Sequence, residues 1–190
     1  YVFAYRKDLL DEAGLKVPTT WSELAETARA LTQKDENGSV TFSGFCFPTT
    51  GGNLVELDVF VFGNGGRWMD DASNPTMTGE EKVEALTFLK GLLPDVNIAY
   101  SSSDTNPFVK GQAAMTLINN VALTGMMAEG SEYAGKVGIA LPPNNGTEAT
   151  FSGCNMLFMG RDCADKDAAW RFIEFVMTEE STLKRAEMCN

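Results

Sequence analysis

The stretch Phe108-Val-Lys-Gly-Gln-Ala-Ala-Met-Thr-Leu-Ile-Asn-Asn120 carries the strongest indication of the fold. Gly111 tolerates the positive φ that ends a helical turn, so we expect a short helix to stop there. The apolar run 113–118 is too short for a surface helix, which favours a buried strand. Asn119 and Asn120 then lie where the strand ends and the next helix begins. Open α/β sheets bind ligands at this position.

Helical and strand patterns alternate on both sides of this stretch, which predicts an α/β fold. Thr20 and Glu23 have the spacing of a capping box, and so do Thr78 and Glu81. Pro94 is expected to end the second of these helices. We expect further helices over 6–13, 54–62 and 121–129 and after Asp165 and Thr178, and strands over 40–47, 137–141 and 150–159.

Apolar spacing also predicts which helical side chains face the core. Trp21 and Trp170 lie on or near apolar helix faces and are expected to be buried. In the helix after Thr78 the inward residues are expected to be Val83, Leu86, Leu89, Leu92 and Leu93. In the helix after Asp165 they are expected to be Ala169, Phe172, Ile173 and Val176.

Composition limits the function. The 190 residues are 44% hydrophobic, which is enough for one or two domains with a core. A net charge of -11 disfavours nucleic acid as a partner, because nucleic-acid binding needs a basic face. The chain contains no His, so Ser-His-Asp catalysis and His-ligated zinc are excluded. The sequence predicts no cofactor and no metal site.

The four cysteines, Cys46, Cys154, Cys163 and Cys189, form neither a CxxC pair nor a metal-ligand cluster. One interpretation is free, buried thiols. The other is a disulfide between Cys163 and Cys189, because a hairpin of the two helices between them would bring its outer ends together.

Five segments resemble one family, the extracellular solute-binding proteins of ABC transporters, and within it the carbohydrate-binding group that includes maltose-binding protein. They follow one another in the family's order and cover nearly the whole chain. The segments are Tyr5-Arg-Lys-Asp-Leu-Leu-Asp-Glu-Ala-Gly-Leu15 with Pro18-Thr-Thr-Trp-Ser-Glu-Leu24, Phe108-Val-Lys-Gly-Gln-Ala-Ala-Met115, Lys136-Val-Gly-Ile-Ala-Leu-Pro142, Phe151-Ser-Gly-Cys-Asn155 and Ala168-Ala-Trp-Arg-Phe-Ile-Glu-Phe-Val-Met-Thr-Glu-Glu180.

The resemblance implies a two-lobed, type II periplasmic-binding-protein fold with the ligand in the cleft between the lobes. Residues 1–135 would belong to the C-terminal lobe, and 136–190 would cross back to the N-terminal lobe, with both lobes incomplete. We therefore expect a fragment of a monomeric bacterial protein, located outside the cytoplasm in the periplasm or as a surface lipoprotein. The signal segment would lie outside this chain. The implied partners are a small-molecule solute, most simply a carbohydrate, and the ABC permease in the membrane.

Three groups of residues are candidate ligand contacts. Asn119 and Asn120 follow the strand that the family points at the cleft, and a carboxamide can donate to and accept from a sugar hydroxyl. Either residue could instead be a helix cap. Many relatives carry an aromatic residue just here for stacking, whereas this chain has Val121. The other candidates are Thr49, Thr50, Gly52 and Asn53 in a polar loop, and Ser152, Gly153 and Asn155 in a turn.

Alternative functions remain open from the sequence. A carbohydrate-active enzyme would need two carboxylates facing one cleft, and Glu56 with Asp58 fit poorly because residues two apart on a helix do not share a face. A non-sugar solute, such as a polyamine or a phosphate ester, is a second alternative. A structural or interaction domain is a third. The polar segment 100–105 is expected to form a rim loop.

Overall fold

The computed structural model describes residues 1–51, 55–153 and 156–188. The chain forms two compact units, Tyr1–Ser152 and Gly153–Asn190. Strands and helices alternate as the sequence predicted. No helix in the described part of the chain is long and apolar enough to cross a membrane. In order, the elements are β1 (Val2–Arg6), α1 (Lys7–Glu12), α2 (Trp21–Leu31), β2 (Gln33–Lys34), β3 (Val40–Phe42), α3 (Val55–Gly63), α4 (Glu80–Val96), β4 (Met115–Ile118), α5 (Asn120–Met127), β5 (Val137–Ala140), α6 (Lys166–Val176) and α7 (Glu179–Met188).

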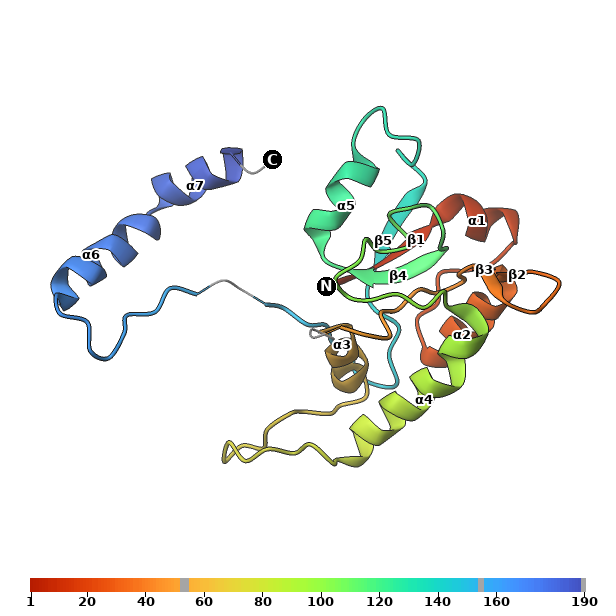
Figure 1. The fold of residues 1–190 in the computed structure, drawn as a ribbon, viewed down its shortest axis with the longest axis horizontal. Coiled ribbons are helices and arrows are strands. Elements are labelled where there is room, and N and C mark those ends of the chain that lie inside the picture. The colour runs from red at the N-terminus through yellow and green to blue at the C-terminus, as the bar shows by residue number, and fades with distance from the viewer. Residues whose placement is uncertain (52–54, 154–155, 189–190) are drawn as a thin grey trace. The chain divides into compact units, whose positions relative to one another are not determined.

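A three-stranded sheet in the order β4-β1-β5 organises the first unit (Figure 1). The central strand β1 is antiparallel to both neighbours, with Val2 opposite Ile118 and Phe3 opposite Ala140. The strand predicted over 113–118 is β4, and all four of its residues are buried. The short helix predicted before Gly111 is a turn over 107–111 instead, and Gly111 at its end has φ 72°, a conformation that glycine tolerates.

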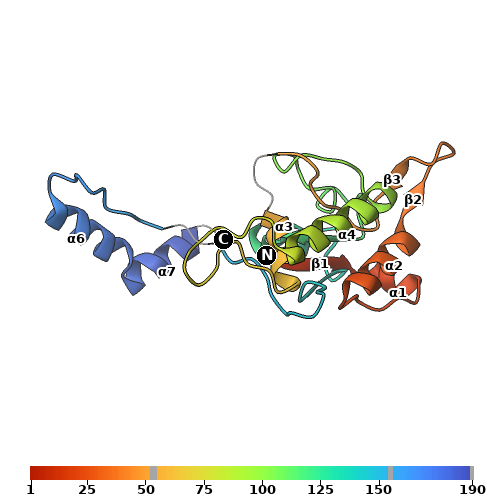
Figure 2. The ribbon, with the colours of Figure 1, turned by 90° about the horizontal axis from the view of Figure 1, so that it is seen from below.

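The two faces of this sheet bury different helices, because alternate residues of a strand point to opposite sides. Phe3 and Leu117 belong to a core formed with α2, α3 and α4. Ala4 and Ile118 belong to a second core, to which α5 contributes Leu123 and Met126. Figures 1 and 2 show α4 extending from α3 to α2, and it contacts both helices. The result is a sheet covered on both sides.

Phe60 of α3 is the centre of an aromatic cluster in the larger core. Its ring centroid lies 5.7 Å from that of Trp21, 5.9 Å from that of Phe47, 6.0 Å from that of Phe88 and 6.2 Å from that of Phe45. These distances are typical of tilted and edge-to-face aromatic pairs. The cluster fixes α3 against α2 and α4, and the burial expected for Trp21 is confirmed.

One of the two predicted capping boxes is present. The Thr20 hydroxyl accepts from the backbone N–H of Glu23, whose carboxylate accepts from the backbone N–H of Thr20. The prediction at Thr78 is wrong, because α4 begins one residue later and Gly79 is its N-cap without a side-chain hydrogen bond. A residue outside the N-cap is badly placed to reach the first helical N–H groups.

The predicted inward face of α4 is only partly correct. Val83 and Leu86 are exposed, whereas Ala85, Leu89, Leu92 and Val96 are buried. This spacing of four, three and four residues forms one continuous stripe, and Val83 and Leu86 lie outside it. Pro94 does not end the helix, which continues to Val96. A proline fits helical φ and removes a single hydrogen bond, so the last turn tolerates it.

The strand predicted over 40–47 divides into two parts. Val40–Phe42 forms β3 and pairs with β2. Beyond it, Ser43 and Cys46 make isolated parallel bridges to Ala113 and Thr116, beside β4. The second half of the predicted strand therefore extends the edge of the main sheet without forming a regular ladder.

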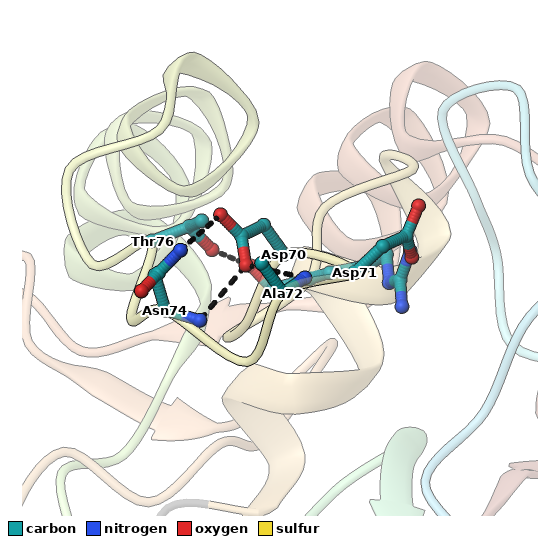
Figure 3. A network of polar contacts seen from close by, with 6 residues as sticks. Asp70, Asp71, Ala72, Asn74 and Thr76 are labelled. Atoms are coloured by element: carbon teal, nitrogen blue, oxygen red, sulfur yellow. Dashed lines mark hydrogen bonds and ion pairs between the residues drawn. The ribbon is translucent and has the colours of Figure 1, made fainter.

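Asp70 organises the loop between α3 and α4 (Figure 3). Its Oδ1 accepts from the backbone N–H groups of Ala72 and Asn74, and its Oδ2 accepts from the Asn74 side chain. Hydrogen bonds of this kind lower the pKa of the Asp70 carboxyl. Arg67 pairs with Asp71 at 2.6 Å. The loop is thus held by its own side chains.

The second unit contains α6 and α7, and neither helix has a buried residue. Asp165 and Thr178 cap them as predicted. The inward positions predicted for Trp170 and Phe172 are wrong, since these side chains are 53% and 60% exposed. An amphipathic stripe predicts burial only where another surface covers it.

The strand predicted over 150–159 is also wrong for the described residues of that range, none of which is in a strand. Extended residues form a strand only when a neighbouring strand accepts their hydrogen bonds. Cys163 in this unit is half-buried. Cys154 and Cys189 lie outside the described residues, so the Cys163–Cys189 disulfide stays a prediction.

Candidate ligand-binding site

A hollow of about 370 Å³ opens where several elements of the first unit end. We call it the polar hollow. Tyr1 lies at the start of β1, and Ile118 and Asn119 lie at the end of β4. The first turns of α3 and α5 contribute Glu56 and Ala122. Because β1 and β4 are antiparallel, the start of one lies beside the end of the other. The loop before β4 completes the wall with Tyr100, Ser102, Asp104, Thr105, Asn106 and Val109, beside Pro48.

Asn119 is both a helix cap and a lining residue. Its Oδ1 accepts from the backbone N–H of Ala122 over 2.9 Å, as an N-cap does. Its amide nitrogen carries two donors at the hollow, and a hydrogen bond to the Tyr1 phenol uses one of them. The two interpretations of Asn119 are thus compatible. Asn120 begins α5, and its side chain lies outside the described residues. Val121 is 74% exposed.

Glu56 lies in the first turn of α3 and lines the hollow. Its Oε2 is buried and has no hydrogen-bond partner among the described residues. Burial and, to a smaller extent, the nearby Asp58 carboxylate raise the pKa of the Glu56 carboxyl, and a hydrogen bond from its own backbone N–H opposes that rise. A buried acceptor without a donor is energetically costly, so this oxygen is suited to receive a donor from a ligand.

Two tyrosines adjoin this carboxylate. Burial and the charge of Glu56 raise the pKa of Tyr1, and the Asn119 side chain opposes that rise. Burial, Cys46 and Glu56 raise the pKa of Tyr100. Both phenols therefore remain protonated and can donate hydrogen bonds. Glu56, Tyr1, Tyr100 and Asn119 together offer an acceptor and several donors in one place.

Thr49 and Thr50 are exposed and do not belong to the lining, but they hold the rim in place. The backbone N–H of Thr49 donates to the Tyr100 carbonyl over 3.0 Å, and that of Ser102 donates to the Thr50 carbonyl over 2.8 Å. Gly52 and Asn53 lie outside the described residues. The rim loop expected over 100–105 does line the hollow.

Ser152 is exposed and follows a residue in contact with Tyr1. The Phe151 ring packs edge-on against the Tyr1 ring at 6.0 Å, and its carbonyl accepts from the Tyr1 nitrogen over 2.7 Å. Gly153 is exposed and begins the second unit. Asn155 lies outside the described residues. Whether these residues contact a ligand stays a prediction.

Sequence reasoning missed Glu56, Tyr1 and Tyr100 as contacts. The sequence offers Glu56 only as half of a catalytic pair with Asp58, and Asp58 instead accepts from Trp68 Nε1 at 2.8 Å. A signal for Glu56 is present in the sequence: it is one of two carboxylates in the first turn of a helix that is otherwise apolar. A carboxylate at a buried helix start is costly in free energy unless a hydrogen-bond donor or a cation pairs with it.

The charge of the lining is acidic. Glu56 and Asp104 are carboxylates, and no Lys or Arg side chain of the described chain lines the hollow. No cluster of three or more metal-ligating side chains occurs in the part of the chain that the structure describes. The hollow can thus receive hydroxyl groups, which donate to carboxylates and accept from phenols and amides. It is poorly suited to an anion.

A model of the bacterial extracellular solute-binding protein family matches residues 1–190. The chain belongs to this family, and the resemblance noted in its sequence is confirmed. The fold class is confirmed as well, because the similar solved structures are solute-binding proteins of ABC transporters.

Three relatives illustrate the similarity. A mannitol-binding protein of Pseudomonas aeruginosa is 28% identical over 165 residues, which cover 81% of this chain and 36% of that protein. A solute-binding protein of Agrobacterium radiobacter, solved with ribitol, is 28% identical with a TM-score of 0.67, covering 99% of this chain and 49% of that one. A Thermotoga lettingae protein, solved with α-D-tagatose, is 21% identical with a TM-score of 0.74, covering 98% and 50%, and shows the fold alone. The chain spans about half the length of the proteins it matches, or less.

Proposed function

We propose that the protein binds a neutral, polyhydroxylated solute, a sugar or sugar alcohol, outside the cytoplasm and delivers it to an ABC importer. The observation that carries this proposal is the buried Oε2 of Glu56 in the polar hollow, which has no hydrogen-bond partner among the residues that the structure describes. Two 28% identical relatives support it, since one is named for mannitol and the other was solved with ribitol. Both ligands are sugar alcohols.

The size and chemistry of the hollow fit this ligand class. Its volume of about 370 Å³ is within the range of small-molecule sites, roughly 300–1,000 Å³. A hydroxyl group can accept from Tyr1, Tyr100 or Asn119 and donate to Glu56 at the same time. Val121 in place of an aromatic residue reduces stacking on a sugar ring, which favours an open-chain polyol over a pyranose.

A polyamine is the second candidate, because Glu56 and Asp104 give the hollow two carboxylates without a countercharge among the described lining residues. The two candidates differ in how they depend on charge. Glu56→Gln keeps an acceptor oxygen and removes the charge, so it should weaken a polyamine far more than a polyol. A phosphate ester is disfavoured, since both carboxylates would repel it.

Within this proposal the protein performs no covalent chemistry. Asp58 is already bonded to Trp68, and Asp104 accepts from the backbone N–H of Ser101 over 2.9 Å. Neither is therefore a free partner for Glu56 in a two-carboxylate hydrolysis. The family consists of binding proteins. Recovery of an unmodified disaccharide after long incubation would agree, whereas its hydrolysis would contradict this part of the proposal.

We further propose that residues 1–135 belong to the C-terminal lobe and that 136–190 include the segments crossing back to the N-terminal lobe. The division into two compact units after Ser152 supports a transition in this region. Ligand would favour the closed arrangement of the lobes, and the closed form would dock on the permease. We propose that the protein is a monomer located outside the cytoplasm, as a periplasmic or lipid-anchored bacterial protein.

A thermal-shift panel on the protein at its full natural length tests this function. Mannitol, ribitol, tagatose, maltose, spermidine and glycerol phosphate would each be titrated. A ligand at 100 times its dissociation constant stabilises by about 2.7 kcal/mol. We expect a response to sugar alcohols or sugars. A response to spermidine alone would favour the second candidate, and a response to glycerol phosphate alone would overturn both.

A further inference from the structure

Asn106 lies in the wall of the polar hollow, yet its carboxamide has no hydrogen-bonding capacity left for a ligand. Oδ1 accepts from the Phe108 backbone N–H at 2.8 Å and from the Cys46 thiol at 3.1 Å. Nδ2 donates to Thr116 Oγ1 at 3.1 Å and to Tyr100 Oη at 3.3 Å. These four bonds use both acceptor positions and both donors of the carboxamide.

The direction of these bonds is fixed. A backbone N–H can only donate, so Phe108 determines which end of the Asn106 carboxamide is the oxygen. Burial raises the pKa of Cys46 to about 11, so its thiol keeps the proton that it donates. Thr116 accepts from Asn106 and donates its own O–H to a backbone carbonyl, that of Cys46 or Leu117, each 3.2 Å away. The amide nitrogen must therefore face Tyr100.

The fixed direction of the Asn106 hydrogen bonds determines what the Tyr100 hydroxyl can do. Its oxygen accepts from Asn106, so its own O–H must donate elsewhere. Within the described chain no oxygen or nitrogen accepts that proton. A hydrogen bond from the Tyr100 hydroxyl to the Cys46 sulfur contributes to the raised pKa of Tyr100, but sulfur is a weak acceptor. A ligand oxygen in the hollow, which Tyr100 lines, is a better one.

We infer that Asn106 is a positioning residue that holds the Tyr100 hydroxyl as a donor toward the hollow, so that together with Glu56 it selects a group able to accept and donate at once. This inference rests on the proposed function and specifies its chemistry. An alcohol hydroxyl satisfies both residues. An ammonium group only donates and gains nothing from Tyr100, and a carboxylate only accepts and is repelled by Glu56.

A double-mutant cycle with Tyr100→Phe and Asn106→Asp tests the inference by calorimetry of the full-length protein with mannitol and ribitol. Asn106→Asp keeps the side-chain shape and both acceptor roles but removes both donors, so the Tyr100 hydroxyl turns to the new carboxylate. We expect each single variant to weaken binding about tenfold, as loss of one neutral hydrogen bond does. The double variant should bind no more weakly than Tyr100→Phe alone.

A merely structural role for Asn106 predicts a different outcome. The loss from Asn106→Asp would then be the same in both backgrounds, so the two losses would multiply to about 100-fold, and that result overturns the inference. Asn97→Asp is the matched control, because it makes the same change at a carboxamide that is bonded to the Phe47 backbone and does not line the hollow. We expect it to leave the affinity nearly unchanged. If Asn106→Asp does not fold, Asn106→Ala replaces it: the Tyr100 hydroxyl then loses the donor that fixes its direction, and the same coupling with Tyr100→Phe is expected.

Carbon NMR of the ligand-free protein with tyrosine labelled at Cζ separates this inference from the proposed function. Asn106→Asp should shift the Tyr100 Cζ resonance, and Asn97→Asp should not. An unchanged Tyr100 resonance in Asn106→Asp overturns the positioning role whatever the ligand. If Asn106→Asp shifts the resonance but the wild-type protein binds no polyol, the proposed function is overturned and the positioning of Tyr100 stands.

Discussion

The indole Nε1 of Trp68 donates a hydrogen bond to Oδ1 of Asp58 over 2.8 Å, and this bond ties the loop after α3 to the helix that carries Glu56. The Lys82 ammonium lies 5.9 Å from the centre of the Trp68 ring, within reach of a cation–π interaction. Burial raises the pKa of Asp58, and the indole donor opposes that rise. The start of α3 is thereby held from outside the hollow.

Trp68→Phe should therefore destabilise the protein. The variant leaves the half-buried Asp58 carboxylate without its donor, which costs about 1–3 kcal/mol. Trp170→Phe is the matched control, because Trp170 donates to Glu174 in the same way on an exposed helix. We expect its effect to stay within about 0.5 kcal/mol. Urea unfolding of both variants measures the difference, and equal effects would contradict the role given to Asp58.

Two substitutions separate the roles of Asn119. Asn119→Ala removes the cap of α5 and should cost about 1 kcal/mol of stability together with ligand affinity. Asn119→Asp keeps the oxygen that accepts from Ala122 and loses the amide donor. It should therefore retain stability and lose affinity. Melting temperature and calorimetry distinguish the two roles, and unchanged affinity in Asn119→Asp would restrict Asn119 to capping.

The carboxyl of Glu56 should make stability depend on pH. Its pKa in the folded protein is raised above the ordinary 4.5, so its protonated form is the one that folding favours. The corresponding stability is fully present below pH 4.5 and is lost as pH rises through the raised value. Asp58 also acts on Glu56, whereas Tyr1 and Tyr100 remain neutral in this range.

Unfolding of wild type and Glu56→Gln between acid and neutral pH measures this contribution. Glu56→Gln should gain stability relative to wild type as pH rises. Glu12→Gln, a change at an exposed glutamate, provides the baseline. A difference between wild type and Glu56→Gln that stays constant, or shrinks, as pH rises would contradict the account of Glu56 as a desolvated carboxylate.

Cys46 should be unreactive in the folded protein. It is 1% exposed, and its raised pKa of about 11 leaves almost no thiolate at pH 8. Iodoacetamide should leave the Cys46 peptide unmodified in the native protein and modify it in urea, as followed by mass spectrometry. Native labelling at the rate of a free thiol would show that the network around Asn106 opens readily.

Local sequence patterns predicted the parts of the fold that depend on neighbours along the chain. Gly111 needs a positive φ, Glu23 reaches Thr20 three residues away, and Asn119 caps the helix that it precedes. The same patterns failed where a distant partner decides. Burial of Trp170 requires a surface to cover α6, and a strand over 150–159 requires a neighbouring strand.

The sequence predicted where the candidate site lies better than it predicted which residues line the site. The end of β4 proved to be part of the hollow, as the stretch ending at Asn119 indicated. Glu56, Tyr100 and Tyr1 come from segments that are distant in sequence, and only the antiparallel pairing of β1 with β4 and the packing of α3 bring them together. No local pattern carries that information.

Calorimetry of the full-length protein with mannitol and ribitol, in wild type and Glu56→Gln, tests the central claim most directly. The account predicts saturable binding of one molecule of at least one of these polyols. In Glu56→Gln, which keeps a neutral acceptor, that binding should weaken about 3- to 30-fold, the difference between a hydrogen bond to a charged acceptor and one to a neutral acceptor, while the protein stays folded. Polyol binding that Glu56→Gln leaves unchanged, or no polyol binding by wild type, would contradict it.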